Sequence, residues 1–314
     1  ASNLGKLTSS GATETVNITA SNAKAYTVSS VVAQSATTLN VTGSGDVVLG
    51  NEAALDLAAA TVTRATLIDA STATGKVTIG AAGVPGFEAT SVTVKGGSAA
   101  DKFYFGGTLS AADSIDGGDG TDTLYASDSA TAATYKPLSV TNVEVLEIDT
   151  ITSGAKTFDM TNVAASTGIN IVDTANAAGF GTTVSKIAGQ TVTIKTQDNA
   201  GTATNFTGEN IALSTATGTT SISVVLDDQL TSSLPNGVAF AGAVTTNGAS
   251  SLSITDNVQD ITSLAARYIN NNIDIAGTAT TGVIKTLTLA GGGMRTATAN
   301  STFDVDGTSN VSIS

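Results

Sequence analysis

The chain is built from short segments in which apolar and polar residues strictly alternate, and these segments recur along its whole length. Alternation with a period of two is the pattern of a β-strand that buries one face. Clusters of Gly, Asn, Asp and Ser separate the segments, as is typical of turns. The pattern predicts an all-β chain, with strands at 15–19, 39–42, 92–95, 145–148, 169–172, 192–195, 252–255, 287–290 and 311–313.

The spacing of these segments favours one kind of all-β architecture. The intervals from Leu39 to Leu67, from Leu67 to Val92 and from Val192 to Ile211 are similar in length. Recurrence at roughly 20 to 30 residues is typical of solenoids. We therefore expect an elongated β-solenoid that resembles a parallel β-helix. Tandem β-sandwich modules with regularly spaced hairpins are the alternative.

The composition suits thin layers better than a thick globular core. Apolar residues make up 41% of the chain, but aromatic residues only 4%, and Trp is absent. Thick cores normally use larger side chains. Val and Thr favour strands because their branched Cβ fits a pleated surface. These features agree with stacked β coils or a flat sandwich.

Two regions are expected, one over 1–150 that contains glycine-rich turns at 96–125, and one over 151–314 with further strand repeats. Residues 260–270 break the strand pattern, because their apolar side chains follow helical spacing after Asp260. A short helix is expected there. The Ala-rich stretch 53–60 is a second helix candidate.

The strongest local motif lies at 117–125, which reads GGDGTDTLY. It matches the calcium-binding nonapeptide G-G-x-G-x-D-x-U-x at every specified position. Gly117, Gly118 and Gly120 would allow a tight turn that aims backbone carbonyls at one point. The carboxylate of Asp122, with Asp119 beside it, would add the hard oxygen ligands that Ca²⁺ prefers.

A second copy precedes it at 96–104, which reads GGSAADKFY. It keeps Gly96, Gly97 and Asp101, but Ala99 replaces the third glycine. One coil of such a fold takes two nonapeptides, about 18 residues. The offset between the two copies is slightly longer than this, so it could place the two turns on the same side, one coil apart. Between them, Gly106-Gly107 and Asp113 form a candidate degenerate third copy.

These nonapeptides resemble those of RTX proteins. The segment 141–148, TNVEVLEI, is similar to strands of RTX-type bacterial surface-layer proteins, and the Cys-free composition rich in Thr, Ala, Ser, Gly and Val resembles theirs. The resemblance implies a secreted protein of the bacterial cell surface. It also implies Ca²⁺ that rigidifies the β domains and bridges copies of the chain into a lattice.

A further calcium candidate lies near the end of the sequence, where Asp304 and Asp306 alternate before Gly307. This stretch lacks the distal Glu of an EF-hand loop. A polar turn is the alternative interpretation.

Several functions are disfavoured by what the sequence lacks. The absence of His and Cys removes the usual zinc ligands and the Ser-His and Cys-His nucleophile pairs. With a net charge of −13 and scattered basic residues, nucleic acid is an unexpected partner. No apolar run is long enough to form a membrane-spanning helix, so no membrane span is expected.

The sequence thus predicts a non-enzymatic, self-assembling subunit of a bacterial surface layer or extracellular filament, stabilised by Ca²⁺. Its expected partners are other copies of itself and a cell-surface polysaccharide. An adhesin or biofilm-matrix segment that binds glycans or surfaces is the first alternative. A calcium-dependent polysaccharide lyase is the second.

Overall fold

The structure is a computed structural model that describes residues 2–9, 14–22, 24–57, 66–87, 91–127, 134–150, 155–173, 181–196, 210–228, 243–256, 272–275, 286–291, 303–305 and 311–313. The chain divides into two compact units. The first comprises Ala1–Glu147 with Asn162–Thr167, and the second comprises Ile148–Thr161 with Gly168–Ser314.

The first unit is built around three parallel sheets. Each sheet forms by the stacking of one strand from each of several successive coils. One sheet has the order β1 (Ser2–Asn3), β4 (Tyr26–Val28), β7 (Val47–Leu49), β10 (Val77–Ala81), β13 (Lys102–Gly106) and β15 (Thr123–Ser127). The facing sheet has the order β3 (Thr15–Ala20), β6 (Thr38–Gly43), β9 (Thr66–Asp69), β12 (Val92–Lys95), β14 (Ser114–Asp116) and β17 (Ser139–Thr141). The third contains β2 (Lys6–Thr8), β5 (Ser30–Ala33) and β8 (Asp56–Leu57).

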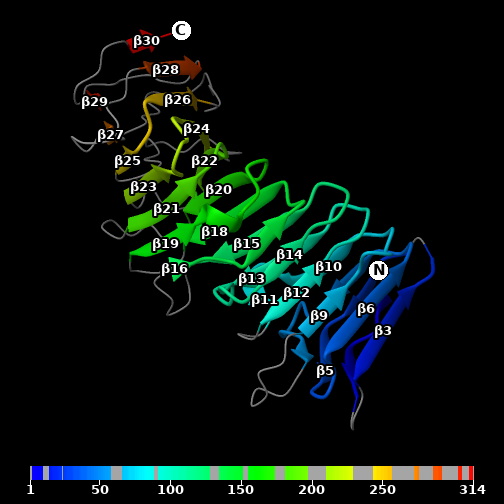
Figure 1. The fold of residues 1–314 in the computed structure, drawn as a ribbon. Helices are drawn as coiled ribbons and strands as arrows, with labels where there is room; N and C mark the ends of the chain where they lie inside the picture. The colour runs from blue at the N-terminus through cyan, green and yellow to red at the C-terminus, as the bar shows by residue number, and fades with distance from the viewer. Residues whose placement is uncertain are drawn as a thin grey trace, which may run out of the picture. The chain divides into compact units, whose positions relative to one another are not determined.

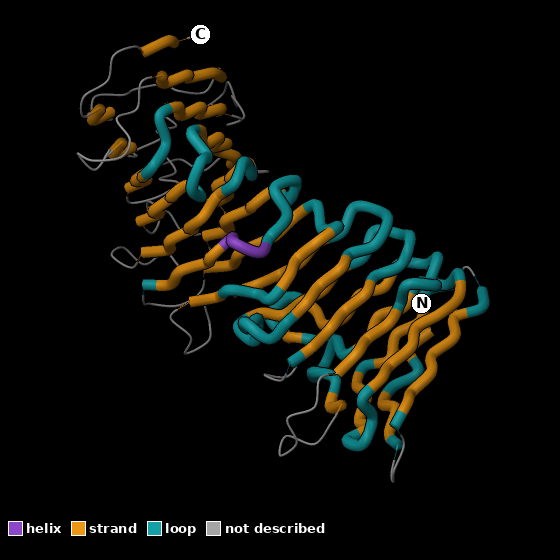
Figure 2. The backbone as a smooth tube through the Cα atoms, viewed as in Figure 1, coloured by secondary structure: helices purple, strands orange, loops and turns teal. Residues whose placement is uncertain are grey.

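The chain visits these sheets in turn and returns to each of them one coil later. Coil length varies within the first unit, because Lys102 pairs with Thr123 whereas Val47 pairs with the more distant Val77. Figure 1 shows β3, β6, β9 and β12 lying side by side in this parallel arrangement, and Figure 2 shows the loops that join the strands at their ends. The predicted β-solenoid is confirmed, and the β-sandwich alternative is wrong.

The interior of the first unit is a stack of small apolar side chains, as the composition predicted. In one inner column Val94, Ile115 and Val140 occupy the same register position on successive coils. All three are buried. Stacking equivalent positions about 4.8 Å apart gives each apolar side chain a neighbour above and below, so a continuous core forms without large aromatic residues.

One local departure interrupts the coil pattern after β10. The short strand β11 (Val84–Pro85) pairs antiparallel with β10, whereas every other pairing whose register is described is parallel. Phe87, which follows β11, stacks on Phe105 with ring centroids 4.0 Å apart. The two rings lie in the interior beyond β8, which is the last described strand of the third sheet.

The second unit repeats the coil arrangement with two parallel sheets. One has the order β20 (Gly168–Asp173), β22 (Thr191–Thr196), β24 (Ser221–Asp228), β26 (Ser251–Asp256), β28 (Thr286–Gly291) and β30 (Val311–Ile313). The other has the order β19 (Lys156–Asp159), β21 (Gly181–Ile187), β23 (Asn210–Thr215), β25 (Ala243–Asn247), β27 (Asn272–Ile275) and β29 (Phe303–Val305). Of the two remaining strands, β16 (Thr134–Tyr135) belongs to the first unit, and β18 (Val145–Thr150) spans the boundary between the two units in the sequence.

All nine segments predicted from alternation are strands, but none of the three spacings joins register partners; Leu67, for example, pairs with Thr93 and not with Val92. Val192 and Ile211 lie on different sheets, because the partner of Val192 on the next coil is Val224. Leu39 pairs with Ile68, and Leu67 lies on the opposite face of its strand. Coil length also varies within the second unit, because Ile169 pairs with Val192 whereas Val192 pairs with the more distant Val224.

Helix is nearly absent from the described residues, in which one short 3-10 element (Met160–Asn162) occurs. The helix predicted at 260–270 lies outside those residues. The helix candidate at 53–60 is wrong in its described part, because Asp56 and Leu57 form β8. Within the described ranges no helix is long and apolar enough to cross a membrane.

Candidate metal centre at the glycine-rich turns

The two nonapeptide copies form equivalent turns on successive coils of the first unit. Residues 96–101 join β12 to β13, and residues 117–122 join β14 to β15. Lys102 and Thr123, which follow the two turns, are register partners. The prediction that the offset between the copies stacks the turns one coil apart on the same side is therefore confirmed.

Close approach of neighbouring backbones explains the leading glycine of each turn. A Cβ on Gly96 would lie 1.9 Å from the carbonyl oxygen of Gly117, and a Cβ on Gly117 would lie 1.8 Å from that of Asn142. Neither glycine has a positive φ, so the expected conformational reason does not apply to them. It does apply to Gly118 and Gly120, whose φ angles are 92° and 129°.

The second glycine of the earlier turn is also confined by backbone. A Cβ on Gly97 would lie 2.4 Å from the carbonyl oxygen of Ala73, which belongs to the preceding turn. The carbonyl oxygen of Gly97 accepts a hydrogen bond from the N–H of Asp119 at 2.9 Å. Stacked turns are thus joined by direct backbone hydrogen bonds, and Asp119 itself has an exposed side chain.

Asp101 is fully buried, and both of its carboxylate oxygens accept hydrogen bonds from backbone N–H groups. Val77 donates to Oδ1 at 2.7 Å, and Gly97 donates to Oδ2 at 2.7 Å. Val77 is the first residue of β10, which lies on the preceding coil and pairs with β13. The side chain therefore connects its own turn to the coil before it.

Asp113 repeats this geometry at the start of β14, in the facing sheet. It is 1% exposed, its Oδ1 accepts from the N–H of Val92 at 3.0 Å, and its Oδ2 accepts from the N–H of Ser110 at 2.7 Å. Val92 is the first residue of β12, which lies on the preceding coil and pairs with β14. The candidate degenerate third copy thus lies in the opposite sheet from the other two turns.

Asp122 differs from the other two because only one of its oxygens is hydrogen-bonded. Oδ1 accepts from the N–H of Asp101 at 2.7 Å, whereas Oδ2 is buried and has no partner in the described structure. The side chain is 0% exposed. A buried oxygen without a donor is costly unless a proton or a cation neutralises it.

Glu144 extends the same column by one coil and was missed as a site residue. Its Oε2 accepts a hydrogen bond from the N–H of Asp122 at 2.7 Å. The signal was available in the sequence, because Glu144 follows Asp122 at the same offset by which Asp122 follows Asp101, within one residue. Asp101, Asp122 and Glu144 therefore form a column of three carboxylates, the carboxylate column.

The pKa values of these groups reflect burial and mutual repulsion. Burial raises the pKa of Asp101 and of Asp113, and the backbone N–H donors oppose that increase. Burial raises the pKa of Asp122 to about 7; the N–H of Asp101 lowers it, and the negative charges of Asp101, Glu144 and Asp116 raise it further. Asp122 is the carboxylate whose charge is least compensated by the protein.

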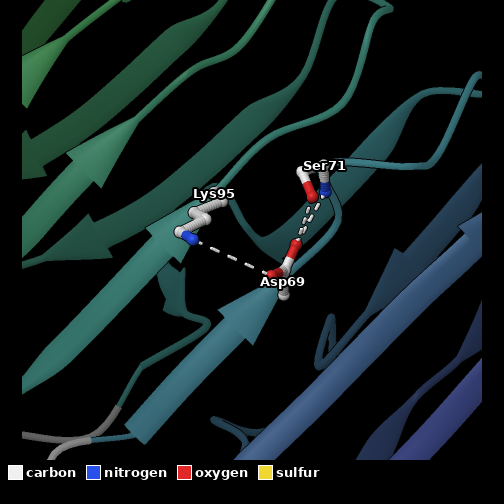
Figure 3. A network of polar contacts seen from close by, with 3 residues as sticks. All are labelled: Asp69, Ser71 and Lys95. Carbon is white, nitrogen blue, oxygen red and sulfur yellow. Dashed lines mark hydrogen bonds and ion pairs between the residues drawn. The ribbon is translucent and has the colours of Figure 1, made fainter.

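A second polar column runs along the outer face of the facing sheet, on the strand residues that precede the turns. Asp69, Lys95 and Asp116 are register neighbours in this column. Figure 3 shows Oδ1 of Asp69 accepting from the N–H and the hydroxyl of Ser71 at 3.0 and 2.6 Å, with Lys95 Nζ 4.0 Å from Asp69 Oδ2. An exposed pair of this kind contributes little stability, so this column is a solvated surface.

The calcium candidate near the end of the sequence stays a prediction. Asp304 lies in β29, in register with Asp274 on β27, and its side chain is not described. Asp306 lies outside the described residues.

The hydrogen-bond donors that surround each carboxylate limit where Ca²⁺ fits. This ion takes six to eight oxygen ligands, and the described residues contain no group of three or more His, Cys, Asp or Glu side chains placed to hold a metal. The oxygens of Asp101 and Asp113 already face N–H donors, whose partial positive charge opposes a cation. Among the buried carboxylates of Asp101, Asp113 and Asp122, Oδ2 of Asp122 is the one oxygen without a described hydrogen-bond donor. Both this Oδ2 and the carbonyl oxygen of Asn142 lie close to the Cβ position of Gly117.

Comparison of the chain with known protein families, with curated proteins and with solved structures found no match.

Proposed function

We propose that this protein is a structural subunit of an extracellular bacterial assembly, a surface layer or a filament, and that Ca²⁺ stabilises it. The observation that supports this best is the continuous ladder of parallel strands in both units. Such a ladder is a repetitive scaffold with a close-packed interior. The absence of His and Cys from the sequence agrees with a mechanical role.

Self-assembly is supported by exposed apolar side chains on the described residues around β2. All of β2 is exposed. Two of the large apolar side chains that remain exposed, Leu4 and Leu7, lie in this region. Exposed apolar side chains that lie together on a repetitive scaffold suit a contact with another copy.

Calcium stabilisation is supported by Asp122 alone among the three buried carboxylates Asp101, Asp113 and Asp122. When bound, Ca²⁺ would neutralise the buried oxygen that has no hydrogen-bond donor. Asp122→Asn tests this well, because asparagine keeps one oxygen for the N–H of Asp101 while it removes the charge. Asp122→Ala would remove both the charge and this hydrogen bond, so the effects of the two losses could not be separated.

The test is electron microscopy of the purified chain in Ca²⁺ and in EDTA, with melting temperatures measured in parallel. We expect ordered sheets or filaments in Ca²⁺, dispersal in EDTA, and a higher melting temperature in Ca²⁺ for the wild type but not for Asp122→Asn. Dispersed molecules in both conditions would contradict assembly and favour an adhesin. A wild-type melting temperature that EDTA does not change would contradict the calcium part.

A further inference from the structure

The motif carboxylates are placed where the strands of successive coils begin. Asp101 and Asp122 come directly before β13 and β15, and Asp113 comes directly before β14. In each case one oxygen accepts the N–H of a residue on the preceding coil, at the level where the paired strand of that coil begins. In all three cases this hydrogen bond joins two successive coils through a side chain. It lies at the point where the backbone hydrogen bonds between the paired strands begin.

The bonds form a relay along the carboxylate column. Val77 donates to Asp101, Asp101 donates its own N–H to Asp122, and Asp122 donates its own N–H to Glu144. Asp113 makes the corresponding bond to Val92 at the opposite sheet. Because the contact recurs at equivalent positions of both sheets, it is a property of the coil and not of a single turn.

Asp101 and Asp113 differ from Asp122 in their second oxygen. In Asp101 this oxygen accepts from Gly97 and in Asp113 from Ser110, so a donor from its own turn completes each carboxylate. A charged carboxylate that accepts two backbone N–H groups is stabilised as an anion in the interior. A cation at either position would have to face or displace these donors.

We infer that Asp101 and Asp113 are cation-independent latches that fasten each coil to the preceding one, and that Asp122 alone among these three buried carboxylates is open to a cation. The latch function does not depend on assembly. Only the assignment of Asp122 rests on the proposed function. Asp101 and Asp122 therefore differ chemically, although both occupy the aspartate position of the nonapeptide motif.

The test is amide hydrogen exchange by NMR, with urea unfolding, on Asp101→Asn, Asp113→Asn and Asp122→Asn in Ca²⁺ and in EDTA. Asparagine has one acceptor oxygen, so one donor of each latch loses its partner. For Asp101→Asn we expect exchange at Val77 or Gly97 to accelerate on the order of tenfold or more in both conditions. For Asp113→Asn we expect the same at Val92 or Ser110.

Two controls keep the inference testable if a latch variant fails to fold. Asp119→Asn changes an exposed carboxylate in the same motif and should leave exchange unchanged. In the wild type, the amides of Val77, Gly97, Val92 and Ser110 should be equally protected in Ca²⁺ and in EDTA. Asp122→Asn should keep the protection of Asp101 in EDTA, because it retains an acceptor oxygen.

Protection of Val77 and Gly97 that disappears in EDTA would overturn the latch and identify Asp101 as a calcium ligand. A loss for Asp101→Asn that occurs only in Ca²⁺ would lead to the same conclusion. If Asp122→Asn exposes the amide of Asp101 in EDTA, Asp122 is a third latch and not an open cation position. Failure of assembly would affect none of these outcomes.

Discussion

Gly117→Ala is expected to prevent the stacking of the glycine-rich turns and to unfold the first unit. The new Cβ would lie 1.8 Å from the carbonyl oxygen of Asn142 and 2.7 Å from Oδ2 of Asp122. The first of these atoms is backbone that is held by the stacked turns, so the overlap cannot be relieved by rotating a side chain. We expect a loss above about 4 kcal/mol, measured by urea unfolding followed by circular dichroism.

Gly83→Ala is the matched control for this substitution. Gly83 has a φ of +73°, but nothing lies within 4 Å of the Cβ position. Its cost is therefore conformational only, about 1–2 kcal/mol. If Gly83→Ala destabilised the protein more than Gly117→Ala, the close stacking of the turns would be contradicted, because Gly117 has the more permissive backbone conformation.

Phe103→Ala is expected to have the second largest effect. Phe103 is fully buried and occupies an inner column between Ile79 and Leu124 on the neighbouring coils. Truncation leaves a cavity in an interior of paired strands that cannot collapse without breaking register. The expected cost is about 3–5 kcal/mol, measured by the same unfolding experiment.

Leu138→Ala serves as the comparison, because Leu138 is 60% exposed. Removing its side chain should change stability by less than about 0.5 kcal/mol. Equal losses for Phe103→Ala and Leu138→Ala would mean that the inner column described for the first unit is not the core.

The strands could be predicted from the sequence because one physical rule determines them. Alternation identifies a half-buried strand directly, and the predicted bounds match Val92–Lys95 and Val311–Ile313. Parallel stacking followed from the offset between Asp101 and Asp122, which fits one coil. Other coil lengths could not be predicted, because loops of different length connect the strands, as the pairing of Val192 with Val224 shows.

The chemistry of the turns was only partly predictable. The nonapeptide pattern identifies where Asp101 and Asp122 lie, but it does not say whether their oxygens face backbone N–H groups or a cation. That difference depends on contacts with the neighbouring coil, which a motif of nine positions does not contain. Glu144 was missed for the same reason, since its role comes from stacking on Asp122 and not from a motif of its own.

Disulfide formation between introduced cysteines tests the central claim, the stacking of coils in register, most directly. The chain has no cysteine of its own. Lys102 and Thr123 are register partners on adjacent parallel strands, whose spacing of about 4.8 Å is within disulfide range. Ser114 is closer to Lys102 in sequence but lies in the facing sheet, where its partners are Thr93 and Ser139.

After mild oxidation, mass spectrometry should find the disulfide in the double variant with Lys102→Cys and Thr123→Cys. It should find none in the double variant with Lys102→Cys and Ser114→Cys. The opposite result, a disulfide between positions 102 and 114 but not between 102 and 123, would mean that consecutive strands pair as hairpins, and it would contradict the stacked coils on which the latch and calcium proposals depend.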